Sequence, residues 1–258
     1  MPNVSARTAK EKLEARRVSS GAEWDDLVLS RRTMDALERV IALASQKRGV
    51  RALFSGPSGT GKTFAAILLG KRLRRPVYRV DLSAADSKYI GETEKNLAAL
   101  FERAEAKGWI LFFDEADSLF GKRSEVKDAH DRYANQEVSY LLKRAEAFDG
   151  LAIFEARGEA ALDGALAGSI DARVAFEPPE ASLRLRLWEK SLAGVDEANY
   201  LGKELGEIAR RHKLSCSEIA RISDRVVRQA KRGHGEALFR DRLERTIRRE
   251  LTRRDDEG

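Results

Sequence analysis

Hydrophobic and polar positions change their pattern at about residue 180. Before that point, short apolar runs alternate with amphipathic helical patterns. The apolar runs lie at 52–55, 77–81, 109–113, 151–154 and 173–176, and the helical patterns at 33–45, 64–73, 92–107 and 135–147. Strands that alternate with helices predict a parallel sheet covered by helices. After Pro178-Pro179 only helical patterns follow, including an apolar stripe from Phe239 to Leu251, which predicts a second, all-helical domain.

These patterns predict three parts of the chain. Residues 1–22 are polar and basic and are expected to form a flexible N-terminal tail, although the short apolar segment from Trp24 can dock. Residues 23–180 are expected to form an α/β domain, and residues 181–258 a helical domain. A length of 258 residues is enough for one large domain or for two modest domains, each with its own core.

Composition excludes several classes of protein. A hydrophobic content of 42% with 35% charged residues is typical of a soluble globular protein, and no apolar run reaches the length of a membrane span. The net charge of +6 permits nucleic-acid contact, but no basic and aromatic recognition motif accompanies it, so a solvated surface is favoured. A single cysteine, Cys216, and a start without an apolar signal segment predict a cytoplasmic protein.

A phosphate-binding loop is predicted between the first strand and its helix. The segment matches G-x-x-x-x-G-K-[ST] in full and comprises Gly56, Pro57, Ser58, Gly59, Thr60, Gly61, Lys62 and Thr63, with Phe64 following in the helix. The glycines let backbone N–H groups converge on phosphate oxygens at a helix N-terminus. Lys62 is expected to reach the β- and γ-phosphates of ATP, and the Thr63 hydroxyl to ligate Mg²⁺.

Two acids at the end of the third apolar run complete the predicted ATP site. Asp114 and Glu115 follow the run Ile110–Phe113, and ligands bind at the carboxyl ends of parallel strands. Asp114 is expected to hold Mg²⁺, and Glu115 to orient and deprotonate the attacking water as the catalytic base. A polar strand end is the alternative, but its position downstream of a phosphate loop favours the functional interpretation.

With both motifs in place, the chain resembles the AAA+ ATPases, in particular the branch that includes spastin, katanin and the membrane-bound AAA proteases. The resemblance runs from Trp24 onward and implies a P-loop NTPase α/β fold followed by a small helical lid domain. It also implies a hexameric ring. Lys88, Tyr89, Ile90 and Gly91 resemble the first pore loop of that branch, in which an aromatic residue grips a polypeptide substrate. A tyrosine packed at a helix start is the alternative for Tyr89.

Residues 119–123 and 128–136 resemble a bacterial subgroup of stand-alone ATPases, some of which are encoded beside contractile injection systems. The second segment contains His130. No partner His or Cys lies at ligand spacing, so we interpret His130 as a loop residue and not a metal ligand.

The chain departs from the family at positions that serve hydrolysis. Ala156-Arg157 stands where relatives end the strand with Thr-Asn, whose amide helps to position the attacking water, and arginine cannot accept a hydrogen bond. Counting from the landmark Leu162-Asp163, the paired arginine fingers of relatives fall on Gly168 and Ser169. Unless Arg157 or Arg173 is repurposed, hydrolysis by the protein alone should be slow.

A third family feature is a pair of small residues in the helical domain, and this chain has different small residues at those positions. Relatives place small residues where Cys216 and Ser217 stand, in the helix that covers the nucleotide. Both are small enough for nucleotide packing, and Cys216 is interpreted as a small apolar filler and not a nucleophile.

Three hypotheses remain open from the sequence. The leading one is an ATP-dependent protein-remodelling or disassembly subunit that engages a polypeptide through Tyr89, in a homo-oligomeric ring or together with a finger-bearing AAA+ chain. The second is an ATP-binding assembly or scaffold subunit with little intrinsic ATPase activity. The third, a motor acting on nucleic acid, rests only on the net charge.

Overall fold

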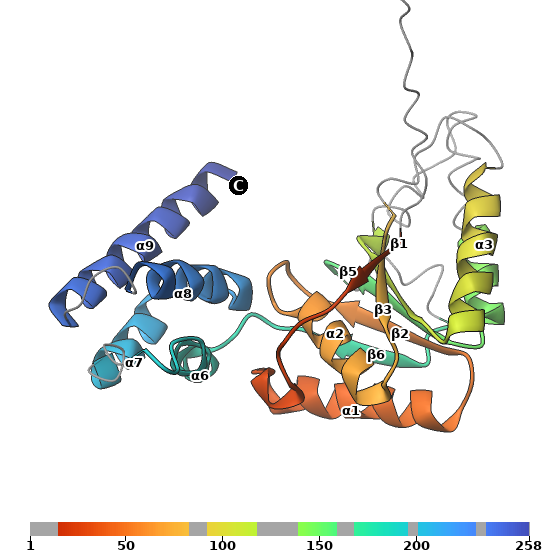
Figure 1. The fold of residues 1–258 in the computed structure, drawn as a ribbon, viewed down its shortest axis with the longest axis horizontal. Helices are drawn as coiled ribbons and strands as arrows, with labels where there is room; N and C mark the ends of the chain where they lie inside the picture. Colours follow the sequence, from red (N-terminus) through yellow and green to blue (C-terminus); the bar gives the residue numbers. More distant parts are fainter. Residues whose placement is uncertain are drawn as a thin grey trace, which may run out of the picture.

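The chain forms a mixed sheet flanked by helices, followed by a helical region (Figure 1). The computed structural model describes residues 15–82, 92–117, 139–158, 168–195, 201–230 and 236–257. The predicted class, an α/β sheet followed by a small helical lid, is confirmed.

Five strands of the sheet are parallel. The strands are β1 (Ala15–Val18), β2 (Val50–Ser55), β3 (Val77–Asp81), β4 (Ile110–Asp114), β5 (Leu151–Ala156) and β6 (Ala172–Ala175). Their order is β1-β3-β4-β5-β2-β6, with only β1 antiparallel to its neighbour among these strands. The carboxyl ends of β2, β4 and β5 therefore lie side by side, and the predicted ATP site is placed at that edge.

Alternation of side chains explains why both faces of the sheet are covered. In β4, Leu111 and Phe113 pack into one core with α3 (Glu92–Lys107) and the helical residues 139–147. Ile110 and Phe112 point to the opposite face and pack with α1 (Arg31–Gln46) and α2 (Lys62–Leu73). All five residues of β4 are buried, as an unbroken apolar run predicts for a central strand.

Residues 15–18 differ from the flexible tail expected over residues 1–22. They form β1, which pairs with the outer edge of β3 from Ala15 opposite Val80 to Val18 opposite Val77. Ala15 and Val18 also pack against the two cores of the sheet. An unpaired edge strand exposes a row of backbone donors and acceptors, and β1 covers that row on β3. A run as short and basic as Ala15–Val18 carries no strand signal of its own.

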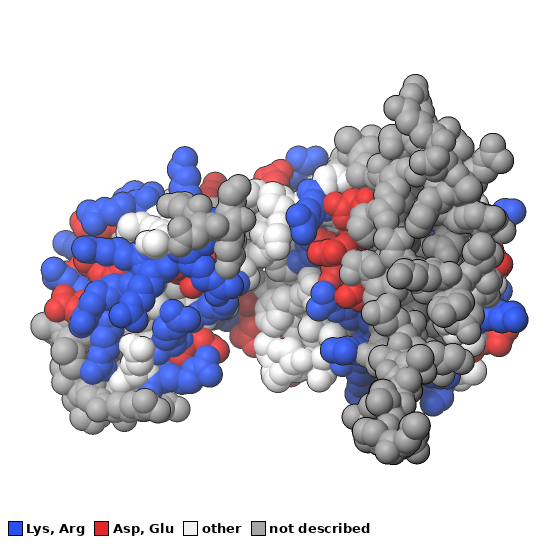
Figure 2. All heavy atoms as spheres, turned by 90° about the horizontal axis from the view of Figure 1, so that it is seen from above, with Lys and Arg blue, Asp and Glu red and all other residues white. Residues whose placement is uncertain are grey.

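In the part of the chain that the structure describes, four helices follow the sheet. They are α6 (Ala181–Ser191), α7 (Gly202–Arg211), α8 (Cys216–Ala230) and α9 (Glu236–Glu257). Their core includes Trp188, Phe239 and Leu243, so the predicted stripe is buried. On the face drawn in Figure 2, Lys and Arg cover much of this region. In the described part of the chain, no helix combines the length and apolarity needed to cross a membrane.

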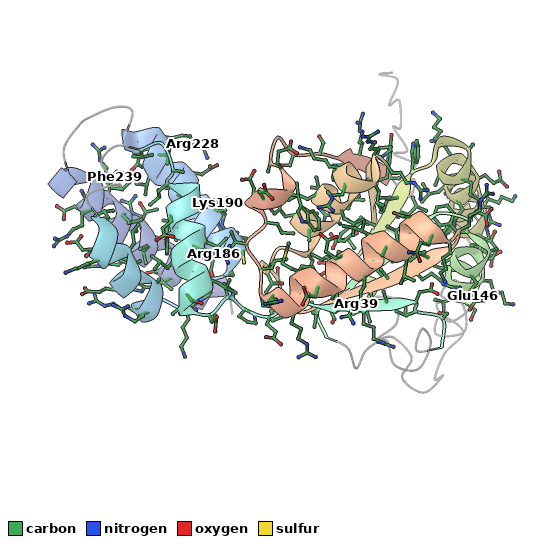
Figure 3. The ribbon with its side chains drawn as sticks, turned by 90° about the horizontal axis from the view of Figure 1, so that it is seen from below. Arg39, Glu146, Arg186, Lys190, Arg228 and Phe239 are labelled. Carbon is green, nitrogen blue, oxygen red and sulfur yellow. The ribbon has the colours of Figure 1, made fainter. Side chains whose placement is uncertain are left out.

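Side-chain contacts join the helical region to the rest of the chain. Arg184 of α6 is buried; its Nε donates to the Ala209 carbonyl at 2.7 Å, and its Nη1 to the Pro179 carbonyl. Lys190 lies on the side of α6 that faces the sheet (Figure 3) and pairs at 3.4 Å with Asp26, in the 3-10 turn Trp24–Asp26. The apolar segment after Trp24 therefore docks, as predicted, with Leu27 and Val28 buried.

Candidate functional site

The phosphate loop connects β2 to α2 and its backbone requires glycine. Gly56 has φ 140°, and a Cβ there would lie 2.0 Å from the Phe176 carbonyl oxygen. Gly61, with φ 101°, precedes the first residue of α2. Both conformations are open to glycine and strained for other residues. The loop therefore delivers the N-terminus of α2 to the carboxyl edge of the sheet, where helix N–H groups attract anions.

Lys62 is turned back toward the loop that precedes it. Its side chain is 5% exposed, and Nζ donates to the Pro57 carbonyl at 2.8 Å and to the Gly56 carbonyl. The Thr60 hydroxyl donates to the same Pro57 carbonyl at 2.8 Å. These bonds hold the loop closed around the ammonium group, so its positive charge lies inside the cradle.

The two predicted acids lie at the end of β4, and each is paired with an arginine. Asp114 forms an ion pair with Arg79 of β3. Glu115 has φ 50°, a left-handed conformation rare outside glycine, and its Oε1 lies 3.4 Å from Nη2 of Arg157. Such backbone strain is often found at functional sites, where the surrounding fold holds it in place.

A cavity of about 380 Å³ lies between these groups. It is lined by Ser58, Gly59, Gly61, Lys62, Thr63, Phe64, Arg79, Asp114, Glu115, Glu155, Arg157 and Ser217. The structure therefore brings most of the predicted loop residues together with both predicted acids. Pro57 and Thr60 line a neighbouring cavity of about 600 Å³ on the other side of the loop.

Glu155 was missed by the sequence reasoning. It lies in β5, is 6% exposed, and its Oε1 is 2.9 Å from Lys62 Nζ. Its Oε2 accepts the Glu115 N–H at 3.0 Å. Burial, followed by a hydrogen bond with Asp114, raises the pKa of the Glu155 carboxyl against the opposing effect of Lys62. The available signal was a single acid inside an otherwise apolar central strand.

The helical region closes the cavity from the other side through the start of α8. Ser215 and Glu218 form a capping box: the Ser215 N–H donates to Glu218 Oε2 at 2.6 Å, and the Glu218 N–H donates to Ser215 Oγ at 3.3 Å. The Ser217 N–H donates to the Gly59 carbonyl at 3.0 Å. A Cβ on Gly59 would lie 2.5 Å from Ser217 Oγ, so this contact also requires glycine in the loop.

A further, mostly apolar cavity is continuous with the 380 Å³ cavity. Its volume is about 440 Å³, and it shares Gly59, Gly61, Phe64 and Ser217 with the first. Its other lining residues are Asp26, Val28, Leu187, Lys190, Ser191, Cys216 and Ala220. Burial raises the pKa of the Cys216 thiol to about 11, which agrees with its interpretation as an inert filler. An apolar cavity beside a phosphate cradle suits the base of a nucleotide.

Several predicted residues lie outside the described part of the chain or away from the cavity. The pore-loop residues Lys88, Tyr89, Ile90 and Gly91 lie outside it, as do His130 and the landmark Leu162-Asp163. Gly168 is described and exposed, and a Cβ built on it meets no atom within 4 Å. Arg173 lies in β6, as the sequence register predicted.

Comparison with known proteins identifies the family. Residues 52–177 match the AAA family, the ATPase family associated with various cellular activities. The chain contains an AAA ATPase module. The AAA module coincides with β2 to β6 and carries the phosphate loop, Asp114 and Glu115, so ATP binding is implied by the family.

The chain is similar to several different kinds of AAA protein. An uncharacterised AAA family ATPase of Sinorhizobium fredii is 32% identical over 135 residues, or 52% of this chain and 40% of the relative. Spastin of Gallus gallus is 30% identical over 217 residues (75% and 34%). A 26S proteasome regulatory subunit 8 homolog of Encephalitozoon cuniculi is 31% identical over 187 residues (67% and 47%). The matches thus span less than half the length of each of these relatives.

Proposed function

We propose that the protein is an ATP-dependent remodelling subunit that binds Mg·ATP in the 380 Å³ cavity and, alone, hydrolyses it slowly. The observation that carries this proposal is the convergence of Lys62, Thr63, Asp114 and Glu115 on one cavity at the carboxyl edge of the sheet. The proposal treats residues 23–180 as the ATPase domain and 181–258 as its lid.

Each residue has a distinct role in the proposed reaction. Loop N–H groups and Lys62 bind the phosphates of ATP, and Glu115 orients a water and takes its proton as the water attacks the γ-phosphate. The Thr63 hydroxyl and the Asp114 carboxylate are the groups that would hold Mg²⁺. One hydroxyl, one carboxylate and the phosphates of the substrate are a typical donor set for this ion, whose charge offsets that of the phosphates.

Slow hydrolysis follows from the groups that surround Glu115. Arg157 places a guanidinium 3.4 Å from the Glu115 carboxylate, so one oxygen of the proposed base already contacts a cation of the same chain. Gly168 and Ser169 have no positive charge to offer a neighbouring subunit. Arginine fingers contribute on the order of 10³–10⁵ in rate in other P-loop enzymes, so their absence outweighs moderate changes elsewhere in the site.

The proposed substrate is a polypeptide, gripped by Tyr89 in the channel of a hexameric ring. The support is the resemblance of residues 88–91 to a pore loop and the similarity to spastin and to a proteasome regulatory subunit. Another chain with arginine fingers could complete the ATP site at a subunit boundary. The ring, the substrate and the partner chain are parts of this proposal.

A second candidate, an ATP-binding scaffold subunit, is favoured by the pairing of all three acids in the cavity. Asp114 pairs with Arg79, Glu115 with Arg157 and Glu155 with Lys62. A steady-state ATPase rate measured against protein concentration separates the two candidates. A rate that stays at background at every concentration favours the scaffold.

The test of the ATP site compares the loss of one lysine inside the cavity with the loss of one lysine outside it. Lys62→Ala should weaken Mg·ATP binding on the order of 10- to 100-fold, because a charge-assisted hydrogen bond to phosphate is lost. Lys143→Ala, an exposed lysine on the helical residues 139–147, is the control and should bind as wild type. Glu115→Gln should retain binding while turnover falls about 100-fold. Equal ATP affinity in wild type and Lys62→Ala, measured by calorimetry, would reject the site.

A further inference from the structure

Glu155 is an acidic residue buried in a central strand of the sheet. Every residue of β5 is buried, and Glu155 lies opposite Phe54 of β2, two positions before the first loop residue, Gly56. A carboxyl group is seldom buried in a central strand unless it is paired. Its partners therefore indicate what it does.

The carboxylate of Glu155 connects the two nucleotide motifs. Oε1 lies 2.9 Å from the Lys62 ammonium, and Oε2 accepts the backbone N–H of Glu115 at 3.0 Å. The side chains of Lys62 and Glu155 are only 5% and 8% exposed, so solvent screens their attraction weakly. The loop lysine and the strand that carries the acids are joined through this one side chain.

Lys62 has no spare donor in this arrangement. An ammonium group carries three N–H bonds, and here they meet the Gly56 carbonyl, the Pro57 carbonyl and Glu155 Oε1. A phosphate that binds Lys62 must replace one of these partners. Because Glu155 is the only anion of the three, it competes with the phosphates for the same positive charge.

We propose that Glu155 is a specificity-determining residue that competes with the terminal phosphate for Lys62, so that the protein does not favour ATP over ADP. This inference rests on the proposed function. The α- and β-phosphates can bind the N–H groups of the loop without displacing Glu155. The γ-phosphate adds negative charge beside the carboxylate, Asp114 and Glu115, and the cost of that repulsion falls on ATP.

A purely structural role for Glu155 is the alternative. In that case the carboxylate only neutralises a buried lysine in the nucleotide-free fold, and its substitution changes the stability of the protein or its affinity for both nucleotides equally. The ratio of ATP affinity to ADP affinity separates the two roles, because only competition for the terminal phosphate changes that ratio.

The experiment measures binding of ADP and of a non-hydrolysable ATP analogue, both with Mg²⁺, to the full chain by calorimetry. Glu155→Gln keeps the size of the side chain and removes its charge, and Glu155→Ala removes the group. Both should raise affinity for the ATP analogue on the order of 10- to 100-fold, as expected when a like charge beside the γ-phosphate is removed. Affinity for ADP should change less than about threefold, because no γ-phosphate is present.

Glu146→Gln is the matched control. Glu146 is exposed on the helical residues 139–147, at the end of the sheet away from the helical region (Figure 3), and its substitution should leave both affinities unchanged. Thermal melts of each variant without nucleotide report whether the fold is retained. The wild-type protein supplies a measurement that needs no variant: it should bind the ATP analogue no more tightly than ADP.

Three outcomes would overturn the role of Glu155. These are a wild-type preference for the ATP analogue above about tenfold, equal changes for both nucleotides in the variants, and no change for either. In each of them ADP still binds wild type, so the ATP site itself stands. Absence of any nucleotide binding in wild type and every variant would instead remove the proposed function, and the role of Glu155 with it.

Discussion

Cys216 illustrates how a single side chain is set by its position beside the nucleotide cavity. It is the first residue of α8 and lines the apolar cavity together with Val28 and Ala220. Burial raises the pKa of its thiol to about 11, against the opposing effect of a backbone hydrogen bond. A thiol becomes nucleophilic only as the thiolate, so this environment makes Cys216 slow to react.

The expected result is a thiol that reacts with a disulfide reagent on the order of 100-fold more slowly at pH 8 than an ordinary cysteine does, because its thiolate fraction is that much lower. Its reaction rate should keep rising as pH increases to about 11, where the thiolate becomes the main form. The same chain unfolded in guanidinium is the control and should react at the ordinary rate. Ordinary reactivity of the folded protein at pH 8 would show that Cys216 is not in the environment described.

At the scale of elements, β1 affects the stability of the sheet because it covers the outer edge of β3. It adds one antiparallel strand to the outer edge of β3 and places Ala15 and Val18 against the two cores. Arg16 and Arg17, between them, are exposed and keep the new edge charged, which opposes pairing with other chains.

Deletion of residues 1–18 should therefore lower the free energy of unfolding by about 1–3 kcal/mol, from the loss of strand pairing and of the apolar contact of Val18. It should also increase aggregation, because the edge of β3 is uncovered. Deletion of residues 1–14 leaves β1 in place and serves as the control in the same denaturant titration. Equal stability of the two truncated proteins would mean that β1 contributes nothing to the fold.

At the scale of the whole molecule, the proposed ATP turnover depends on which charges can reach the γ-phosphate. The cavity already holds Lys62, Arg79 and Arg157, but each of these cations pairs with an acid of the same chain. Transition-state stabilisation needs a charge that is directed at the phosphate and not neutralised beforehand. Gly168 and Ser169, which the sequence register assigns to the family's finger positions, carry none.

Replacing Gly168 and Ser169 by arginine should raise ATP turnover by at least tenfold at concentrations where the protein assembles. A Cβ added at Gly168 meets no atom of the described residues within 4 Å, so a side chain there starts into open space. Adding Arg157→Asn should raise turnover further, since the ion pair with Glu115 is removed and an amide can position water. Gly168→Ser is the uncharged control. Brisk wild-type turnover that collapses on Arg157→Ala or Arg173→Ala would instead show that one of these residues replaces the fingers.

Much of the fold was predictable because apolar runs and the glycine-rich motif indicate local structure directly. The unbroken apolar runs 110–113 and 151–154 predicted β4 and β5, since a strand covered on both faces carries apolar side chains on each of them. The glycines of the loop motif were expected to let backbone N–H groups converge on phosphate, and Gly56, Gly59 and Gly61 have the positive φ angles that glycine adopts readily. The pairing of β1 with β3 could not be predicted, because a short basic segment becomes a strand only when an open edge is present beside it.

The sequence by itself determined the class of fold, the phosphate loop and the acids at the end of β4, because each depends on residue types at fixed spacing along the chain. Only the tertiary structure decided what those residues touch. Lys62 meets Glu155 because β5 lies next to β2, although the two residues are far apart in the chain. Arg79 meets Asp114 because β3 lies next to β4. Such ion pairs depend on the order of strands in the sheet, which brings residues that are distant in the sequence to one edge. The local pattern of apolar and polar residues does not specify that order.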